Sequence, residues 1–143
     1  MIQIKELFID CVKIVLVGKR REESEMTPEK ETAVLKGLVT RKVNSLTKRW
    51  NRRFSTNIRP RIVYFDRGTD CGYAIGSGEL GFNIKYLKNY KKAFIDEIVP
   101  HEVAHAFQYV VYPNDYHHHS KNWKNLCIEM GGNGNRFHNF SDC

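Results

Sequence analysis

The residues best suited to chemistry are two histidines and a glutamate in the second half of the chain. His101-Glu102-Val103-Ala104-His105 places the histidines four residues apart. On a helix, residues four apart project from the same face, so both imidazoles can reach one ion. Imidazole nitrogens at about 2.0–2.1 Å are typical ligands of Zn²⁺. The pentapeptide therefore predicts a zinc site built on a helix.

Glu102 follows the first histidine and points about 100° further around the helix axis, beside the open position of such a site. There it can take a proton from a water molecule whose pKa the metal lowers to about 7, and later protonate a leaving amine. The predicted chemistry is metal-assisted hydrolysis of a peptide bond, with Glu102 as general base. Two surface histidines beside an ordinary glutamate would give the same five letters, but the apolar flanks and the histidines that follow favour the metal site.

A catalytic zinc ion needs a third protein ligand. His117, His118 and His119 are candidates, because they precede a predicted helix that contains Trp123. The spacing of the residues alone does not choose among them. At least one of the three is expected to be an ordinary exposed histidine.

The elements that position these residues are predicted from apolar spacing and from Pro and Gly. Apolar residues at helical spacing predict a helix over 87–112, ended by Pro113, with a kink at Pro100 favoured over a start there. A further helix is expected over 121–130, closed by Gly131-Gly132. Residues 61–65, 73–75 and 80–83 are predicted to form a small three-stranded antiparallel sheet.

The N-terminal part is expected to be mostly helical. Residues 1–17 form a moderately amphipathic segment that we predict to be helical rather than extended, and residues 18–26 are predicted to be a solvated connection. Thr27-Pro28 is a good helix start, and apolar residues recur at three- and four-residue steps as far as Phe54. With 143 residues the chain has the length of one domain. The predicted fold class is α+β, a single domain with residues 1–26 as an extension.

The net charge of +7 is concentrated in the N-terminal part. Between Thr32 and Phe65 there are nine basic residues and no acidic one. Six of them fall within an arc of about 140° on the predicted 27–54 helix: Arg41, Lys42, Lys48, Arg49, Arg52 and Arg53. Such a face is either a solvated surface or a contact for nucleic-acid phosphates, without base recognition.

Localisation is inferred from what the sequence lacks. Its longest apolar run is too short to span a membrane, and charges interrupt the N-terminus where a signal peptide would be apolar. Four widely scattered cysteines are expected to be reduced thiols. We therefore expect an intracellular protein, cytoplasmic or nucleoid-associated, that does not bind membranes.

Residues 59–140 resemble the SprT-like metallopeptidases, which include the bacterial SprT proteins and the eukaryotic Spartan proteases. The motifs that carry the resemblance are Arg67-Gly68-Thr69, Gly72-x-Ala74, Glu79-Leu80-x-Phe82-Asn83, Phe94-Ile95-x-Glu97-x-Val99-Pro100-His101-Glu102-x-Ala104-His105, His119-x-x-x-Trp123 and His138-x-Phe140. The resemblance implies a zincin-like minimal metallopeptidase core with one catalytic Zn²⁺. Many members continue into a zinc ribbon after this core, and we expect this chain to be the bare protease core.

The resemblance also implies particular residue roles. A third ligand four residues before an aromatic residue corresponds to His119, since Trp123 follows it. Ser120 stands where the family usually has glycine, and the spacing from His105 is one longer than in the bacterial proteins, a distance that His118 would match. The strand Leu80–Asn83 is expected to border the cleft, where an extended substrate could add as a further strand.

These inferences predict a zinc metalloendopeptidase whose substrates are proteins or peptides. Because Spartan relatives degrade proteins crosslinked to DNA, the resemblance implies that DNA delivers the substrate. Two other functions fit the residues. One is a nucleic-acid-binding protein with a structural zinc site and no proteolysis, and the other is a scaffold that no longer cleaves anything.

Overall fold

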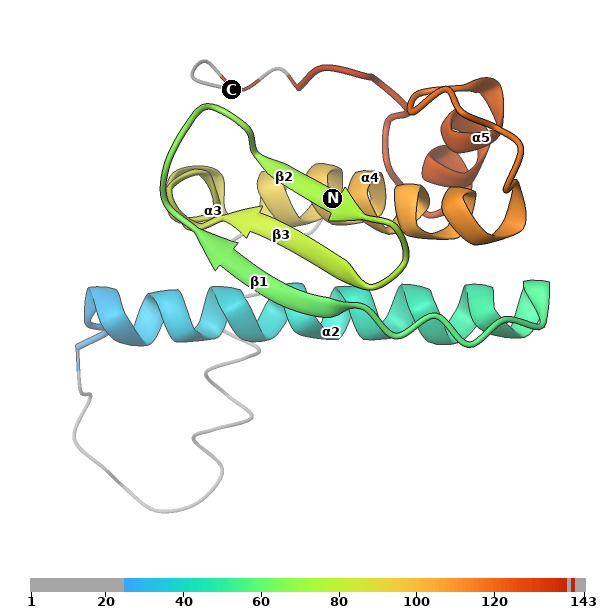
Figure 1. The fold of residues 1–143 in the computed structure, drawn as a ribbon. Coiled ribbons are helices and arrows are strands. Elements are labelled where there is room, and N and C mark those ends of the chain that lie inside the picture. The colour runs from blue at the N-terminus through green and yellow to red at the C-terminus, as the bar shows by residue number, and fades with distance from the viewer. Residues whose placement is uncertain (1–24, 139, 141–143) are drawn as a thin grey trace. The chain divides into compact units, whose positions relative to one another are not determined.

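The computed structural model describes residues 25–138 and 140 (Figure 1). By its contacts the chain divides into two units, Met1–Glu31 and Thr32–Cys143. All the residues predicted to do chemistry lie in the second unit, and this unit is described below. The predicted helix over residues 1–17 lies outside the described residues. The organisation as one domain with an extension over 1–26 stays a prediction.

Helix α2 spans Pro28–Phe54, as predicted. The Thr27 hydroxyl accepts a hydrogen bond from the Lys30 N–H at 3.3 Å, which is the role of an N-cap residue. The apolar residues at three- and four-residue steps form its buried face: Leu35, Val39, Val43, Leu46 and Trp50. The Tyr64 hydroxyl donates to the Lys36 carbonyl at 3.2 Å, so α2 packs against the first strand.

Three strands form one sheet: β1 (Arg61–Phe65), β2 (Gly72–Ile75) and β3 (Glu79–Asn83), in the order β1-β3-β2. The sheet is mixed, because β2 pairs with β3 antiparallel but β1 pairs with β3 parallel. The prediction of an all-antiparallel sheet is therefore wrong. The α+β fold class is confirmed.

The physical reason for the mixed pairing is the loop between β1 and β2. This loop crosses the end of β3, so the two strands that are consecutive in the chain are not neighbours (Figure 1). The buried Asn83 side chain fixes the crossing, because its Nδ2 donates to the Asp70 carbonyl at 3.0 Å. The Asn83 N–H also donates to the Cys71 carbonyl at 2.8 Å. As a consequence β3 is central, and the expectation that it borders a cleft is wrong.

The segment predicted as one helix over 87–112 is two helices, α3 (Ile84–Tyr90) and α4 (Lys92–Val111). They are separated by Lys91, whose φ of 48° lies in the left-handed region and interrupts the helical path. Pro100 lies inside α4, so the proline does not begin the helix. The next helix, α5 (Lys121–Glu129), agrees with the prediction for 121–130.

Helix α4 is the centre of the fold. Its apolar side chains Phe94, Ile98, Val99, Val103 and Phe107 are fully buried. It is packed against α3, β2 and α5. A side chain on α4 is therefore held by packing from several directions, which restricts its freedom before any ligand binds.

The sequence also predicts that the cysteines are reduced and that no segment spans a membrane. Cys127 is a buried free thiol, but Cys71 is disulfide-bonded, so the expectation of reduced cysteines is wrong for Cys71. Among the described helices, none combines the length and apolarity needed to cross a bilayer. Intracellular localisation stays a prediction.

Candidate metal centre

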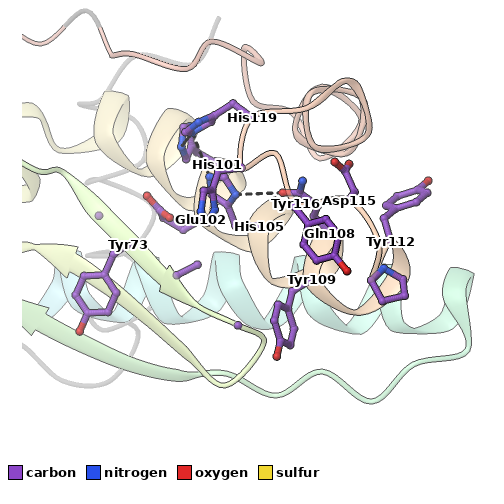
Figure 2. A pocket seen from close by; sticks show the side chains of 15 residues that line it. Tyr73, His101, Glu102, His105, Gln108, Tyr109, Tyr112, Asp115, Tyr116 and His119 are labelled. Atoms are coloured by element: carbon purple, nitrogen blue, oxygen red, sulfur yellow. Dashed lines mark hydrogen bonds between the residues drawn. The ribbon is translucent and has the colours of Figure 1, made fainter.

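Three histidine side chains, called here the histidine group, converge beside the sheet (Figure 2). His101 and His105 project from α4, and His119 comes from the segment just before α5. Nε2 of His119 lies 3.2 Å from Nε2 of His101 and 3.3 Å from Nε2 of His105. The structure thus brings together three of the histidines that the sequence singles out.

The spacing of these nitrogens suits a single metal ion. Two nitrogens bound to one tetrahedral Zn²⁺ at about 2.0–2.1 Å lie about 3.3–3.4 Å from each other. The two measured distances, 3.2 and 3.3 Å, agree with that geometry. Neutral imidazoles are suitable ligands for zinc and for other first-row divalent ions. The group is therefore suited to hold one such ion.

The start of α5 fixes the direction of His119. Ser120 is the N-cap, and its hydroxyl accepts a hydrogen bond from the Trp123 N–H at 3.3 Å. The buried Trp123 ring lies 4.6 Å from the His119 ring, centroid to centroid. Its Nε1 donates to the His101 carbonyl at 3.2 Å. Trp123 therefore holds the segment that carries His119 against α4.

The other two candidate ligands lie outside the histidine group. His117 and His118 are exposed. The His118 ring is 6.3 Å from that of His105, centroid to centroid, and its nitrogens are not part of the group. His117 contributes a backbone carbonyl, described below, instead of its imidazole.

Burial keeps the histidine group neutral. Burial, and secondly the charge of neighbouring histidines, lowers the pKa of His101 to about 2 and that of His105 to about 4. The pKa of His119 is also lowered, first by burial. Protons compete with a metal for imidazole nitrogens. The lowered pKa values therefore leave all three nitrogens available at neutral pH.

Glu102 lies beside this group and is only 4% exposed. Burial, and secondly the charge of Asp70, raises the pKa of its carboxyl to about 8 in the metal-free chain. The carboxylate faces β2, where a Cβ at Gly72 would lie only 2.9 Å from Glu102 Oε1. Glycine at position 72 is what allows strand and carboxylate to approach this closely.

The C-terminal segment supports His101 from another side. Backbone of Asn135 hydrogen-bonds the His101 ring, and the His138 ring lies 4.8 Å from it, centroid to centroid. Nδ1 of His138 is 3.1 Å from a Glu97 oxygen, to which Asn133 Nδ2 also donates. The predicted packing of this segment against the helix that carries His101 is confirmed. A hydrogen bond on one ring nitrogen leaves the other free for a metal.

A cavity of about 510 Å³ opens on one side of the histidine group. Its walls come from β2, α4 and the segment before α5, and include Tyr109 and Tyr116, which are 65% and 83% exposed. Two residues with charged side chains of the Asp, Glu, Lys or Arg type line the cavity, Glu102 and Asp115, and both are acidic. The cavity gives a ligand of moderate size access to the histidines and to Glu102 (Figure 2).

The predicted basic face of α2 lies at the protein surface. Most of its side chains are exposed, and Lys42 is partly buried. Arg53 is engaged within the protein, because its guanidinium pairs with Glu129 of α5 and lies 4.7 Å from the Trp50 ring centroid. The face available for a ligand therefore consists of the remaining five residues: Arg41, Lys42, Lys48, Arg49 and Arg52.

Two residues of the site were missed in the sequence. Gln108 is 4% exposed, and its Oε1 lies 3.4 Å from Nδ1 of His105. Its place three residues after His105, on the same side of a helix, was the available signal. Gly72 was noted as part of a motif, but its closeness to Glu102 depends on how β2 packs on α4. No local pattern reports that contact.

The chain is similar to known proteins of one family. A model of the SprT-like family matches residues 43–141, more than half of the chain. Protein SprT of Cronobacter sakazakii is 36% identical over 88 residues, covering 60% of this chain and 52% of the relative. Protein SprT of Erwinia tasmaniensis is 34% identical over 101 residues, covering 69% and 59%. The chain thus spans little more than half the length of these relatives. No solved structure matches it.

Proposed function

The chain belongs to the SprT-like family, and we propose that it is a zinc-dependent metallopeptidase. The observation that carries this proposal is the placement of Glu102 beside three convergent imidazole nitrogens, all facing one open cavity. Within the described residues, the group offers three ligands and leaves one side to the cavity. A structural zinc site would fill that fourth position with a side chain.

The histidine group would hold the ion, with Nε2 of His101, His105 and His119 as ligands. Bound there, a zinc ion would supply Lewis acidity, which polarises a peptide carbonyl and makes a water molecule more acidic. No nucleophilic side chain is needed for this chemistry. The carboxylate of Glu102 is then the group that handles the proton.

Glu102 is proposed to take a proton from the attacking water and to deliver it to the amine that leaves. A general base works best when its pKa lies near the operating pH. The raised pKa of Glu102, about 8 in the metal-free chain, gives it the proton affinity to act in both directions. A divalent cation nearby favours the ionised carboxylate, which is the form that accepts the first proton.

We place the substrate along β2. This strand is at the edge of the sheet, and Gly72, Tyr73 and Ala74 line the cavity. An extended peptide could pair with its free main-chain groups and cross the histidine group. This placement replaces the earlier expectation for residues 80–83, because β3 lies between two partners and has no free edge.

The test uses the pair Glu102→Gln and His105→Ala against a labelled unfolded protein such as casein. With zinc supplied, wild type should cleave, Glu102→Gln should bind zinc as wild type does but lose cleavage, and His105→Ala should lose both. Cleavage by Glu102→Gln at the wild-type rate would overturn the assignment. A wild-type protein that binds zinc but cleaves nothing, with or without DNA, would favour the scaffold function instead.

A second proposal concerns nucleic acid at the basic face of α2. The exposed cations Arg41, Lys48, Arg49 and Arg52 suit a phosphate backbone. Arg49→Gln with Arg52→Gln should weaken binding to a short single-stranded DNA and flatten its salt dependence. Arg53→Gln is the matched control, because Arg53 already pairs with Glu129. Equal effects of the two sets of substitutions would contradict a specific phosphate-binding face.

A further inference from the structure

The Gln108 side chain has a hydrogen-bond partner on each side of its amide. Its Nε2 donates to the His117 carbonyl at 2.7 Å and to the Ser120 hydroxyl at 3.2 Å. Its Oε1 lies 3.4 Å from Nδ1 of His105. Two of these partners belong to the segment 112–120, called here the ligand loop, which connects α4 to α5 and carries His119. The third is a ligand candidate on α4.

The chemistry of these partners fixes which way the amide points. A backbone carbonyl can only accept hydrogen bonds, so the amide atom that faces His117 must be the nitrogen. The amide oxygen therefore faces His105, and because this oxygen can only accept, Nδ1 of His105 must carry the proton. A neutral imidazole has a single N–H. Nε2 of His105 is then unprotonated, and this is the nitrogen that faces His119.

The Ser120 hydroxyl extends the network to the start of α5. It donates to a carboxylate oxygen of Asp115 and accepts from the Gln108 amide and the Trp123 N–H. One donor and two acceptor positions are the full capacity of a hydroxyl. The Ser120 hydroxyl therefore has no spare donor or acceptor position, which favours a single arrangement of this network.

We propose that Gln108 is a positioning residue that holds His105 in its metal-binding tautomer and at the same time ties the ligand loop to α4. The inference rests on the metal site of the proposed function and extends it to a residue that makes no contact with the ion. Through one amide, the orientation of a ligand on α4 depends on the loop that supplies the third ligand. Partners of this kind typically contribute about 10–100-fold to metal affinity.

Two substitutions separate the two roles. Gln108→Met keeps the length of the side chain and removes every hydrogen bond, so both roles are lost. Gln108→Glu keeps an acceptor for His105 but has no donor for His117 or Ser120, so only the loop is released. Val110→Ala, at an exposed position of the same helix, is the control for general effects on α4.

Three measurements are made on the full chain. Zinc affinity is measured by competition with a chelator, the His105 tautomer by ¹⁵N NMR of the metal-free protein, and the ligand loop by amide hydrogen exchange. Gln108→Met should lower zinc affinity about 10–100-fold and leave the His105 proton no longer confined to Nδ1. Gln108→Glu should keep the Nδ1–H tautomer but speed up exchange in the ligand loop. Val110→Ala should match wild type.

The outcomes are decisive in both directions. A folded Gln108→Met with wild-type zinc affinity would overturn the proposal, and so would a wild-type His105 protonated on Nε2. If Gln108→Met does not fold, the tautomer and loop exchange of Gln108→Glu still decide the question. Failure of the wild-type chain to bind zinc would instead overturn the proposed function, since the tautomer is measured without metal.

Discussion

The positions of the reactive side chains at this site depend on neighbouring residues that do not react themselves. Gly72 is the clearest case, because its Cα lies against the Glu102 carboxylate. A Cβ there would be 2.9 Å from Glu102 Oε1 and 2.9 Å from the Gly81 carbonyl. Both distances are shorter than real contacts of a Cβ. The Gly81 backbone is held in the sheet and cannot move easily, so the Glu102 side chain must shift to make room for the Cβ.

We therefore predict that Gly72→Ala lowers the rate of peptide cleavage by about 100-fold, the typical cost of displacing a catalytic group by about 1 Å. Zinc affinity should remain within a few-fold of wild type, because the histidine group is untouched. Gly78→Ala is the matched control, since its Cβ would meet nothing within 4 Å. Full activity in Gly72→Ala would contradict the assigned position of Glu102.

Glu102 also controls how the stability of the metal-free protein depends on pH. Its pKa rises from 4.5 to about 8 on folding, so between these values only the folded state holds the proton. The contribution of Glu102 to the free energy of unfolding is therefore fully present below pH 4.5 and is lost as pH rises toward 8. For His101 and His105 the sign is opposite. Their pKa values fall from 6.5 to about 2 and about 4, so their contribution is lost as pH falls below 6.5.

Glu102→Gln should therefore stabilise the metal-free chain in a pH-dependent way. Glutamine resembles the protonated carboxyl, so the variant should equal wild type near pH 4.5 and exceed it by about 3 kcal/mol at pH 7. Urea unfolding with a chelator present, at both pH values, measures the difference. A constant difference across this range would mean that Glu102 has an ordinary pKa in the folded chain.

At the scale of elements, the boundary between the ligand loop and α5 decides which histidine can reach the metal. His119 precedes the N-cap Ser120 and stands four residues before Trp123, which fixes its direction. His118 is one residue further out and exposed. His119→Ala should therefore reduce zinc affinity more than the 10–100-fold typical of supporting residues, and His118→Ala should leave it unchanged. The reverse result in the same chelator competition would reassign the third ligand.

The elements differ in how far the sequence could predict them. Helix α2 and strand β1 follow from local patterns, an apolar period after Thr27-Pro28 and a β-branched run after Pro60. The break at Lys91 could not be predicted, because lysine rarely adopts a positive φ and gives no signal of it. Strand order could not be predicted either. It depends on a loop held by Asn83, a long-range contact that no local pattern shows.

At the scale of the whole molecule, the candidate site could be predicted where its spacing is local and not where it depends on packing. His101, Glu102 and His105 lie within one helical turn, so a single segment revealed them. His119 needed the resemblance to a family. The contributions of Gln108 and Gly72 appear only once the ligand loop and β2 are packed against α4.

Because the histidine group joins α4 to the segment before α5, metal binding should stabilise the whole fold. An ion at 100 times its Kd adds about 2.7 kcal/mol to the folded state. For a domain of this size that corresponds to a rise in Tm of about 8–10 °C. Thermal unfolding with zinc and with a chelator measures it, and His101→Ala is the control. An equal rise in that variant would place the ion elsewhere.

The most direct measurement is zinc X-ray absorption on the purified chain, together with metal content. We predict one zinc ion per chain, bound by three imidazole nitrogens at about 2.0–2.1 Å and by one exchangeable oxygen that survives in Glu102→Gln. A chain that takes up no zinc, or one whose zinc has four side-chain ligands, would contradict the account.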